Sequence, residues 1–287
     1  MGTSRKRQAK PARRRPTGRG GKHSTGRRAD LLLAADVGNT SITIGIFDAD
    51  ELVAQWRIAS GLERAADEIA HLLRGLAADR GIRLASPLDC VMCSVVPALT
   101  REFAGALAQL GESPPLIVDH QTDLGIVNRY REPSAVGPDR LANAVAARDL
   151  YGVPAVVVDL GTATTFDVLN ARGEYMGGII APGILTSAEV LFRRAARLQR
   201  VELAPPARVI GRSTEESIRS GIVLGNAIMI DGLVDRIAAE IRAQPLVIAT
   251  GGYVDLVRGI ARSIGIVDLA LTLKGLKAAH RRVRSRA

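Results

Sequence analysis

Two short polar segments carry residue types that suit phosphate binding, and each directly follows an apolar run. DVGNT occupies residues 36–40 after the run 31–35, and DLGTA occupies residues 159–163 after the run 155–158. A glycine lets the backbone approach a ligand closely, while small polar side chains and backbone N–H groups point toward anionic oxygens. An aspartate at a strand end can hold a cation that neutralises phosphate charge. One copy alone is equally well explained as a polar turn, but two copies favour a nucleotide site.

Two further segments fit a cleft that holds a nucleotide and an acceptor. GPDR at 137–140 begins a helical pattern, where Asp139 would cap the helix and backbone N–H groups would attract an anion. TGG at 250–252 ends an apolar run, and its glycines would let the backbone pass beneath a flat base. The structural alternatives are simple capping with a solvated Arg140 and an ordinary strand–helix turn.

The elements that must position these segments occur twice. Residue patterns predict helices within 63–80, 97–110 and 138–152, and strands at 31–36, 42–47, 51–59, 88–95 and 115–120. The succession of strand, phosphate-type turn and second strand starts again at 155, and Asp159 lies 123 residues after Asp36. This internal repeat predicts two similar α/β lobes, 30–152 and 153–280, each a mixed sheet with flanking helices. A nucleotide would lie in the cleft between them.

The positive charge is concentrated at the start of the chain. The net charge is +10, but residues 1–28 contain 11 Lys and Arg and no Asp or Glu, which leaves −1 for the rest. Residues 1–29 are expected to form a disordered basic tail, and residues 281–287 a short basic end. The tail is interpreted either as a solvated extension or as an anchor for nucleic acid or another polyanion. A secretory signal is not expected, because the tail has no apolar core region.

Neither a membrane segment nor a cysteine-based site is expected. The chain has no run of the roughly 18 to 20 apolar residues that a membrane helix needs. Cys90 and Cys93 have no Cys or His partners at zinc-site spacing, and positions three apart on a strand point to opposite faces. Two reduced core cysteines in a cytoplasmic protein are therefore expected.

The segments combine into a recognisable pattern. DVGNT, YREPSAVGPDR, VVVDLGTATTFDV, YMGGIIAPGI, TGG and LTLKGL, in this order, resemble a type III pantothenate kinase of the actin-like ATPase and sugar-kinase superfamily. The resemblance covers residues 31–277 and implies the ribonuclease H-like fold of two lobes. It implies ATP-dependent phosphorylation of pantothenate to 4′-phosphopantothenate, the first step of coenzyme A biosynthesis. It also implies Mg²⁺ and a monovalent cation, K⁺ or NH₄⁺, and a homodimer with the substrate pocket near its interface.

The same resemblance assigns roles to residues at matching positions. It implies that Asp139 is the general base, that Asp159 binds the monovalent cation, and that Asp36 positions Mg²⁺ and the γ-phosphate. The ATP contacts that it implies are Asp36, Val37, Gly38, Asn39, Thr40, Ser41, Ile42, Thr43 and Thr162. The pantothenate contacts that it implies are Tyr130, Gly137, Pro138, Asp139, Arg140 and Thr214.

Two positions depart from the family's pattern. Pro138 stands where a small residue is frequent, so one backbone N–H is missing before the expected base. GRST at 211–214 stands where the family usually has Gly-Lys-Asn-Thr. Neither change removes a side chain that is expected to do chemistry.

Two alternative functions are compatible with the same fold. The first is a regulatory or accessory protein whose catalysis is dispensable and whose basic tail binds nucleic acid. The joint presence of Asp36, Asp139, Arg140 and Asp159 argues against it. The second is a kinase of the same superfamily for another small hydroxy substrate. The segment 130–140 argues against that alternative, because it matches the pantothenate kinases specifically.

Overall fold

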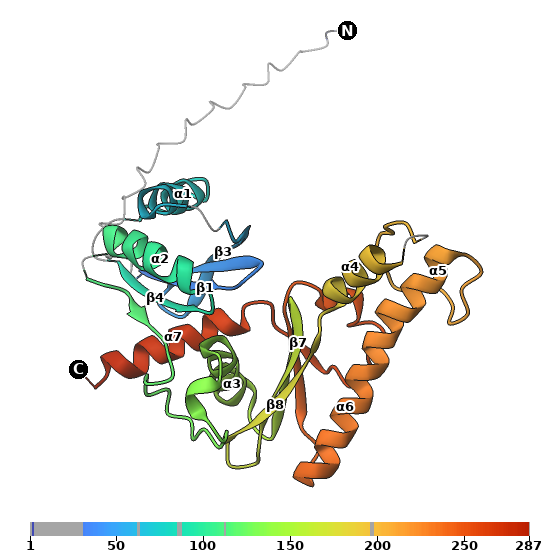
Figure 1. Cartoon of the computed structure of the whole chain (residues 1–287). Coiled ribbons are helices and arrows are strands. Elements are labelled where there is room, and N and C mark those ends of the chain that lie inside the picture. Colours follow the sequence, from blue (N-terminus) through green and yellow to red (C-terminus); the bar gives the residue numbers. More distant parts are fainter. Residues whose placement is uncertain are drawn as a thin grey trace.

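The computed structural model describes residues 2, 31–61, 64–84, 88–111, 113–195 and 198–286. The predicted basic tail at 1–29 lies outside these residues, apart from Gly2. The described residues form two five-stranded sheets with helices around and between them (Figure 1). The predicted class, two lobes that each contain a mixed sheet, is confirmed.

The first sheet is an antiparallel meander followed by two parallel strands. Its strands lie in the order β3-β2-β1-β4-β5, with bounds β1 (Leu31–Val37), β2 (Ser41–Asp48), β3 (Glu51–Ala59), β4 (Asp89–Ser94) and β5 (Leu116–Ile117). β1 pairs antiparallel with β2 across the DVGNT turn and parallel with β4. Because side chains pack against both of its faces, β1 is apolar along almost its whole length.

The second sheet repeats this plan. Its strands lie in the order β8-β7-β6-β9-β10, with bounds β6 (Ala155–Leu160), β7 (Ala163–Leu169), β8 (Tyr175–Pro182), β9 (Leu246–Thr250) and β10 (Ile266–Val267). β6 pairs antiparallel with β7 and parallel with β9, as β1 does with β2 and β4. Each phosphate-type segment therefore connects the first two strands of its own sheet.

Two helices join the sheets into one core. α3 (Pro138–Tyr151) and α7 (Leu271–Arg284) pack against each other, and their buried residues cluster with residues of β1, β4, β6 and β9 (Figure 1). α7 follows the second sheet in sequence but packs on the first sheet. On the opposite face of the first sheet lie α1 (Ala66–Ala78) and α2 (Pro97–Leu110). The start of α3 is thus held between the lobes.

The other α-helices and a π-helical turn belong to the second half of the chain. They are α4 (Ile184–Arg194), α5 (Thr214–Arg219), the π-helical turn η2 (Ser220–Leu224) and α6 (Gly225–Ile241). Two short 3-10 helices lie at Pro133–Ala135 and Val254–Leu256. α6 packs its apolar side on β6, β7 and β9. In Figure 1, α4 and α5 lie at the far end of the second sheet from α3.

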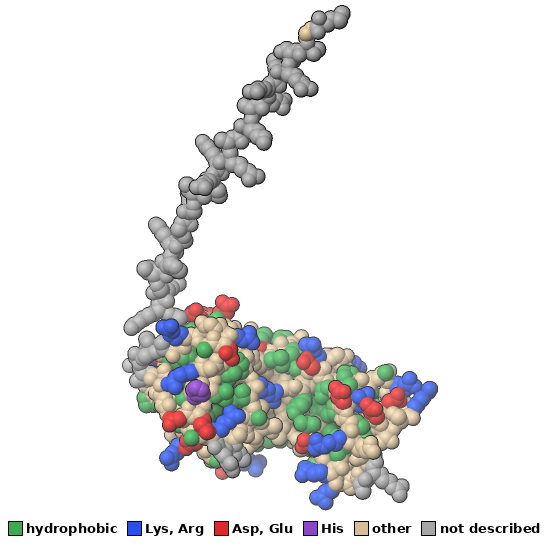
Figure 2. Space-filling view, turned by 90° about the horizontal axis from the view of Figure 1, so that it is seen from above, with side chains coloured by type: hydrophobic (Ala, Val, Ile, Leu, Met, Phe, Trp, Pro, Cys, Tyr) green, Lys and Arg blue, Asp and Glu red, His purple; other side chains and the backbone are tan. Residues whose placement is uncertain are grey.

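Cysteine placement and surface charge also follow the sequence. Cys90 and Cys93 are free and buried, and they belong to different apolar clusters on opposite faces of β4, as predicted. Among the described residues, no helix is long and apolar enough to span a bilayer. Figure 2 shows side chains of both charges interspersed on one face of the body, in keeping with its near-neutral net charge.

Candidate active site

A cavity of about 630 Å³ lies where the two phosphate-type segments meet. The Thr40 and Thr162 hydroxyl oxygens are 2.8 Å apart, so the two segments touch. Each segment is a tight turn: the Gly38 N–H donates to the Ser41 carbonyl at 3.2 Å, and the Gly161 N–H donates to the Ala163 carbonyl at 3.0 Å. The repeated sequence motif therefore forms the two opposed walls of one cleft.

Of the four carboxylates that line this cavity among the described residues, three come from segments that the sequence singled out. Asp36 comes from the end of β1, Asp159 from β6 and Asp139 from the first turn of α3. Burial, together with the charges of Asp139 and Asp159, raises the pKa of Asp36 to about 7. Burial and the charge of Asp139 raise the pKa of Asp159 to about 6, and burial raises the pKa of Asp139. The cavity therefore favours cations or protons beside its carboxylates.

Neutral donors orient two of these carboxylates. The Cys93 thiol donates to Asp36 Oδ1 at 3.4 Å. The Asn143 amide donates to Asp159 Oδ2 at 3.3 Å, and the Thr272 hydroxyl donates to Asn143 Oδ1 at 2.8 Å. Cys93, predicted only as a core residue, therefore also contacts a cavity carboxylate.

The start of α3 differs from the sequence prediction in one respect. Asp139 was expected to cap the helix, but Gly137 is the N-cap residue and no side chain caps it. Pro138 occupies the first helical position, where a backbone N–H has no partner within the helix, so its missing donor costs little. Asp139 lies one residue further on, and its Oδ1 is buried without a hydrogen-bond partner. The Asp139 side chain also lines the cavity.

Arg140 is fixed by a buried aspartate that the sequence did not single out. Its Nε and Nη2 donate to Asp167 Oδ1 at 2.8 and 2.7 Å, and the Tyr175 hydroxyl donates to the same oxygen at 2.8 Å. Asp167 is fully buried, and burial raises its pKa to about 7 against the opposing effect of the Arg140 charge. One edge of the guanidinium is thus occupied, which leaves Nη1 for another partner.

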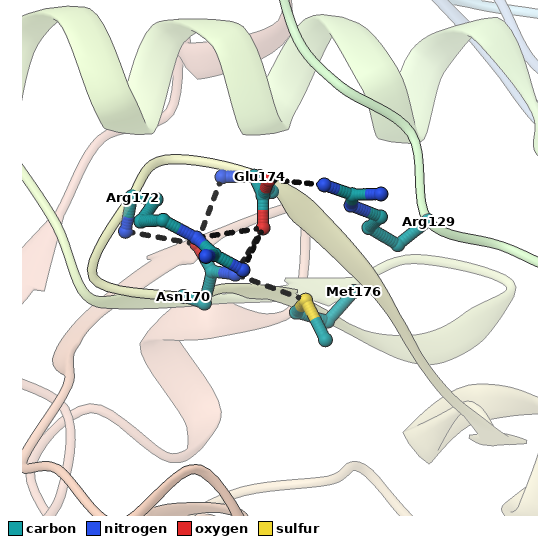
Figure 3. A network of polar contacts seen from close by, with 5 residues as sticks. All are labelled: Arg129, Asn170, Arg172, Glu174 and Met176. Carbon is teal, nitrogen blue, oxygen red and sulfur yellow. Dashed lines mark hydrogen bonds and ion pairs between the residues drawn. The ribbon is translucent and has the colours of Figure 1, made fainter.

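A second network holds the loop that contains Tyr130. Figure 3 shows Glu174 between Arg129 on one side and Asn170 and Arg172 on the other. Glu174 accepts hydrogen bonds from Arg129, Asn170 and Arg172 at 2.7, 2.7 and 3.0 Å. The Arg129 N–H also donates to the Tyr175 carbonyl at 2.8 Å, which adds the loop to β8. These contacts place the Tyr130 ring against Gly177, while Arg140 lies against the neighbouring Gly178.

The residues assigned by resemblance fall into four places. The cavity is lined by Asp36, Gly38, Asn39, Thr40, Ser41, Thr43, Asp139, Asp159 and Thr162. Val37 and Ile42 are buried in the apolar core behind the first segment. Gly137, Pro138, Tyr130 and Arg140 lie outside the lining, the last two beside β8. Thr214 lines a separate cavity of about 660 Å³ at the start of α5.

Solved structures define the class to which this fold and cleft belong. A Campylobacter jejuni protein assigned to the Baf family of transcriptional activators matches with a TM-score of 0.55 and 17% identity, over 88% of this chain and 100% of its own. A Clostridium difficile activator of 2-hydroxyisocaproyl-CoA dehydratase, with bound ADPNP, matches with a TM-score of 0.53 and 15% identity, over 89% of this chain and 97% of its own. MreB 5 of Spiroplasma citri, bound to AMPPNP, matches with a TM-score of 0.51 and 11% identity, over 89% of this chain and 97% of its own. The chain therefore has the actin-like ATPase and sugar-kinase fold.

Sequence comparison identifies the family within that class. The family model of type III pantothenate kinases matches residues 32–236. The type III pantothenate kinase of Moorella thermoacetica is 44% identical over 88% of this chain and 99% of its own length. The type III pantothenate kinase of an Anaeromyxobacter species is 44% identical over 88% of this chain and 100% of its own length. The chain belongs to the type III pantothenate kinase family.

Proposed function

We propose that this protein transfers the γ-phosphoryl group of ATP to pantothenate, which yields ADP and 4′-phosphopantothenate at the first step of coenzyme A biosynthesis. The observation that carries the proposal is the position of Asp139. Its carboxylate opens into the cavity that both phosphate-type segments line, and the adjacent Arg140 is held beside β8. Family membership supports both ATP and pantothenate as substrates.

Asp139 is proposed as the general base. The primary hydroxyl of pantothenate gives its proton to Asp139 while its oxygen attacks the γ-phosphorus. The bond between that phosphorus and the β–γ bridging oxygen breaks, and ADP leaves. Burial raises the pKa of Asp139 from 3.8, which makes its carboxylate a better proton acceptor near neutral pH. Protonation of the carboxyl in acid would remove the base.

The cavity residues are compatible with the two cations that the resemblance implies. Asp36 and Asp159 are half-buried carboxylates, and their pKa values are raised mainly by burial and further by the charge of neighbouring aspartates. Among the described residues, no group of three or more His, Cys, Asp or Glu could hold a metal alone, so each ion would share oxygen ligands with ATP. We propose Asp36 for Mg²⁺, which neutralises phosphate charge, and Asp159 for K⁺ or NH₄⁺.

Arg140 and Tyr130 are proposed to bind pantothenate beside the base. The Arg140 Nη1, which the hydrogen bonds of Nε and Nη2 leave without a partner among the described residues, suits the carboxylate of pantothenate as a charge-assisted hydrogen-bond donor. Tyr130 is 38% exposed, and its ring lies against Gly177, the residue before the one that Arg140 contacts. We also propose that the enzyme acts in the cytoplasm as a homodimer, in which Thr214 of a second copy completes the pocket.

An assay of coupled ADP release tests the proposed function. With ATP, Mg²⁺ and K⁺ present, ADP release should depend on pantothenate, and replacing K⁺ by Na⁺ should reduce the rate. Omission of pantothenate is the control for background ATP hydrolysis. No pantothenate-dependent ADP release under K⁺ would contradict the proposal.

A further inference from the structure

The nucleotide cavity contains one basic side chain, which the family assignments above leave without a role. Its charged lining residues among those described are Asp36, Asp139, Asp159, Asp255 and Arg57. We propose that Arg57 is the cation that the protein itself contributes to the phosphate chain of ATP. This inference rests on ATP as the phosphoryl donor of the proposed function.

Arg57 lies at the edge of the first sheet. It lies on β3, the outermost strand, and its partner on β2 is Thr43, which also lines the cavity. Its Nε donates to the Ser41 hydroxyl at 2.8 Å. The guanidinium is therefore held by the residue that follows the first phosphate-type segment, where an approaching phosphate would meet it.

The other end of the guanidinium reaches the second lobe. It lies directly against Gly252 of the TGG segment, in the space that a Cβ atom at this position would occupy. Arg57 thus extends from the first phosphate segment to the segment expected beneath the base. A nucleotide that lies along the cleft must pass this side chain, and absence of a side chain at Gly252 makes room for it.

Arg57 is positively charged in a cavity whose other charged side chains among the described residues are carboxylates. A polyphosphate that enters a cavity with four carboxylates meets repulsion, which bound cations relieve only in part. The positive charge of Arg57 already opposes the raised pKa values of Asp36 and Asp159. Its Nη groups, unlike its Nε, have no hydrogen-bond partner among the described residues. A guanidinium can give such groups to two phosphate oxygens at once, which an ammonium cannot match.

Calorimetric binding of ADPNP and of adenosine to the full chain, without pantothenate, tests the proposal. With Arg57→Gln, ADPNP should bind about 10- to 100-fold more weakly, the range expected for a charge-assisted hydrogen bond. Adenosine, which has no phosphate, should bind within about twofold of wild type. The ADPNP affinity of Arg57→Lys should lie between those of wild type and Arg57→Gln. The matched control is Arg101→Gln, at a side chain on α2 that is 94% exposed. Unchanged ADPNP affinity in Arg57→Gln, or equal weakening of ADPNP and adenosine, would overturn the proposal.

Gly252→Ala gives a second test that leaves the charge in place. The added methyl group would displace the guanidinium, so ADPNP binding should weaken in the wild-type background and change much less in Arg57→Gln. Equal weakening in both backgrounds would contradict the contact between Arg57 and Gly252. Both tests are independent of turnover: a chain that binds ADPNP through Arg57 but does not phosphorylate pantothenate would overturn the proposed function and not this inference.

Discussion

Asp36, Asp139 and Asp159, the carboxylates proposed to take part in binding and catalysis, are placed where they reduce stability. Each carboxylate is partly removed from water, and Asp36 and Asp159 are additionally close to the charge of Asp139. Their pKa values rise because the ionised forms are disfavoured until a cation or a proton arrives. On the proposed function, the buried charge that costs stability would also favour the binding of cations together with ATP.

Asp36→Asn should stabilise the protein in alkaline solution while it impairs activity. The pKa of Asp36 rises from 3.8 to about 7 in the folded state, so its stabilising contribution is complete below about pH 4 and is lost as the pH rises through 7. At pH 8 the ionised carboxylate costs on the order of 4 kcal/mol, which Asn avoids. Urea unfolding with EDTA should show a gain of roughly 2 to 4 kcal/mol at pH 8 and less than half of it at pH 5. An equal gain at both pH values would refute this account of Asp36.

At the residue scale, the sequence predicted which carboxylates lie in one cleft, but not the contacts of the two arginines beside them. The repeat spacing anticipated that Asp36 and Asp159 face one cleft. The pairing of Arg140 with Asp167 was not predicted, because it depends on how α3 crosses β7. The position of Arg57 was not predicted either, since a strand pattern does not show which lobe a side chain will reach. The predicted Asp139 cap was wrong because Pro138 takes the first helical position.

At the element scale, β8 positions both side chains proposed for pantothenate. Gly177 and Gly178 contact Tyr130 and Arg140, and the Glu174 network attaches the loop at 127–131 to the start of this strand. Helices α2 and α3 were predicted with nearly the observed bounds, because proline begins each and a glycine follows each. The strand expected at 115–120 shortened to Leu116–Ile117, because the chain turns at Asp119, whose carboxylate accepts from the N–H groups of residues 121 and 122.

Two arginine variants distinguish a positioning role of this loop from general stabilisation. Arg129 and Arg172 both donate to Glu174, but only Arg129 belongs to the loop that carries Tyr130. Arg129→Met should therefore raise the KM for pantothenate several-fold and leave the KM for ATP unchanged. Arg172→Met should leave both close to wild type, because it removes a contact within the β7–β8 turn. Steady-state kinetics measures this, and identical behaviour of the two variants would show that the loop does not position the substrate.

At the scale of the whole molecule, Thr214 suggests that one copy does not hold the complete pocket. It lies at the start of α5 and lines a different cavity from Asp139, and α5 is remote from α3 in Figure 1. The segment before it exposes Val209 and Ile210, at 71% and 81%. The proposed second copy would cover these two side chains. No pattern in a single sequence shows where a second copy lies, so this level of organisation was predicted only from the resemblance.

Ile210→Glu should separate the proposed dimer and, with it, lower the rate. The side chain lies in an exposed segment before α5, so a charge there would not disturb the core of one copy. Light scattering after size-exclusion chromatography should report a mass near twice 30.4 kDa for wild type and near 30.4 kDa for the variant. Leu150→Glu, at a leucine 53% exposed near the end of α3, should stay dimeric. A wild-type protein that elutes as an active monomer would contradict the proposed assembly.

The most direct test of the account is transfer of labelled γ-phosphate from ATP to pantothenate by wild type and Asp139→Asn. Asn has nearly the volume of Asp but cannot accept the proton, so nucleotide binding should persist while transfer falls by about 10²- to 10⁴-fold. Wild-type transfer should also decline in acid as the Asp139 carboxylate, whose pKa is raised by burial, becomes protonated. Labelled 4′-phosphopantothenate from wild type and almost none from Asp139→Asn is the predicted result. Equal transfer by the two proteins would contradict the role of Asp139.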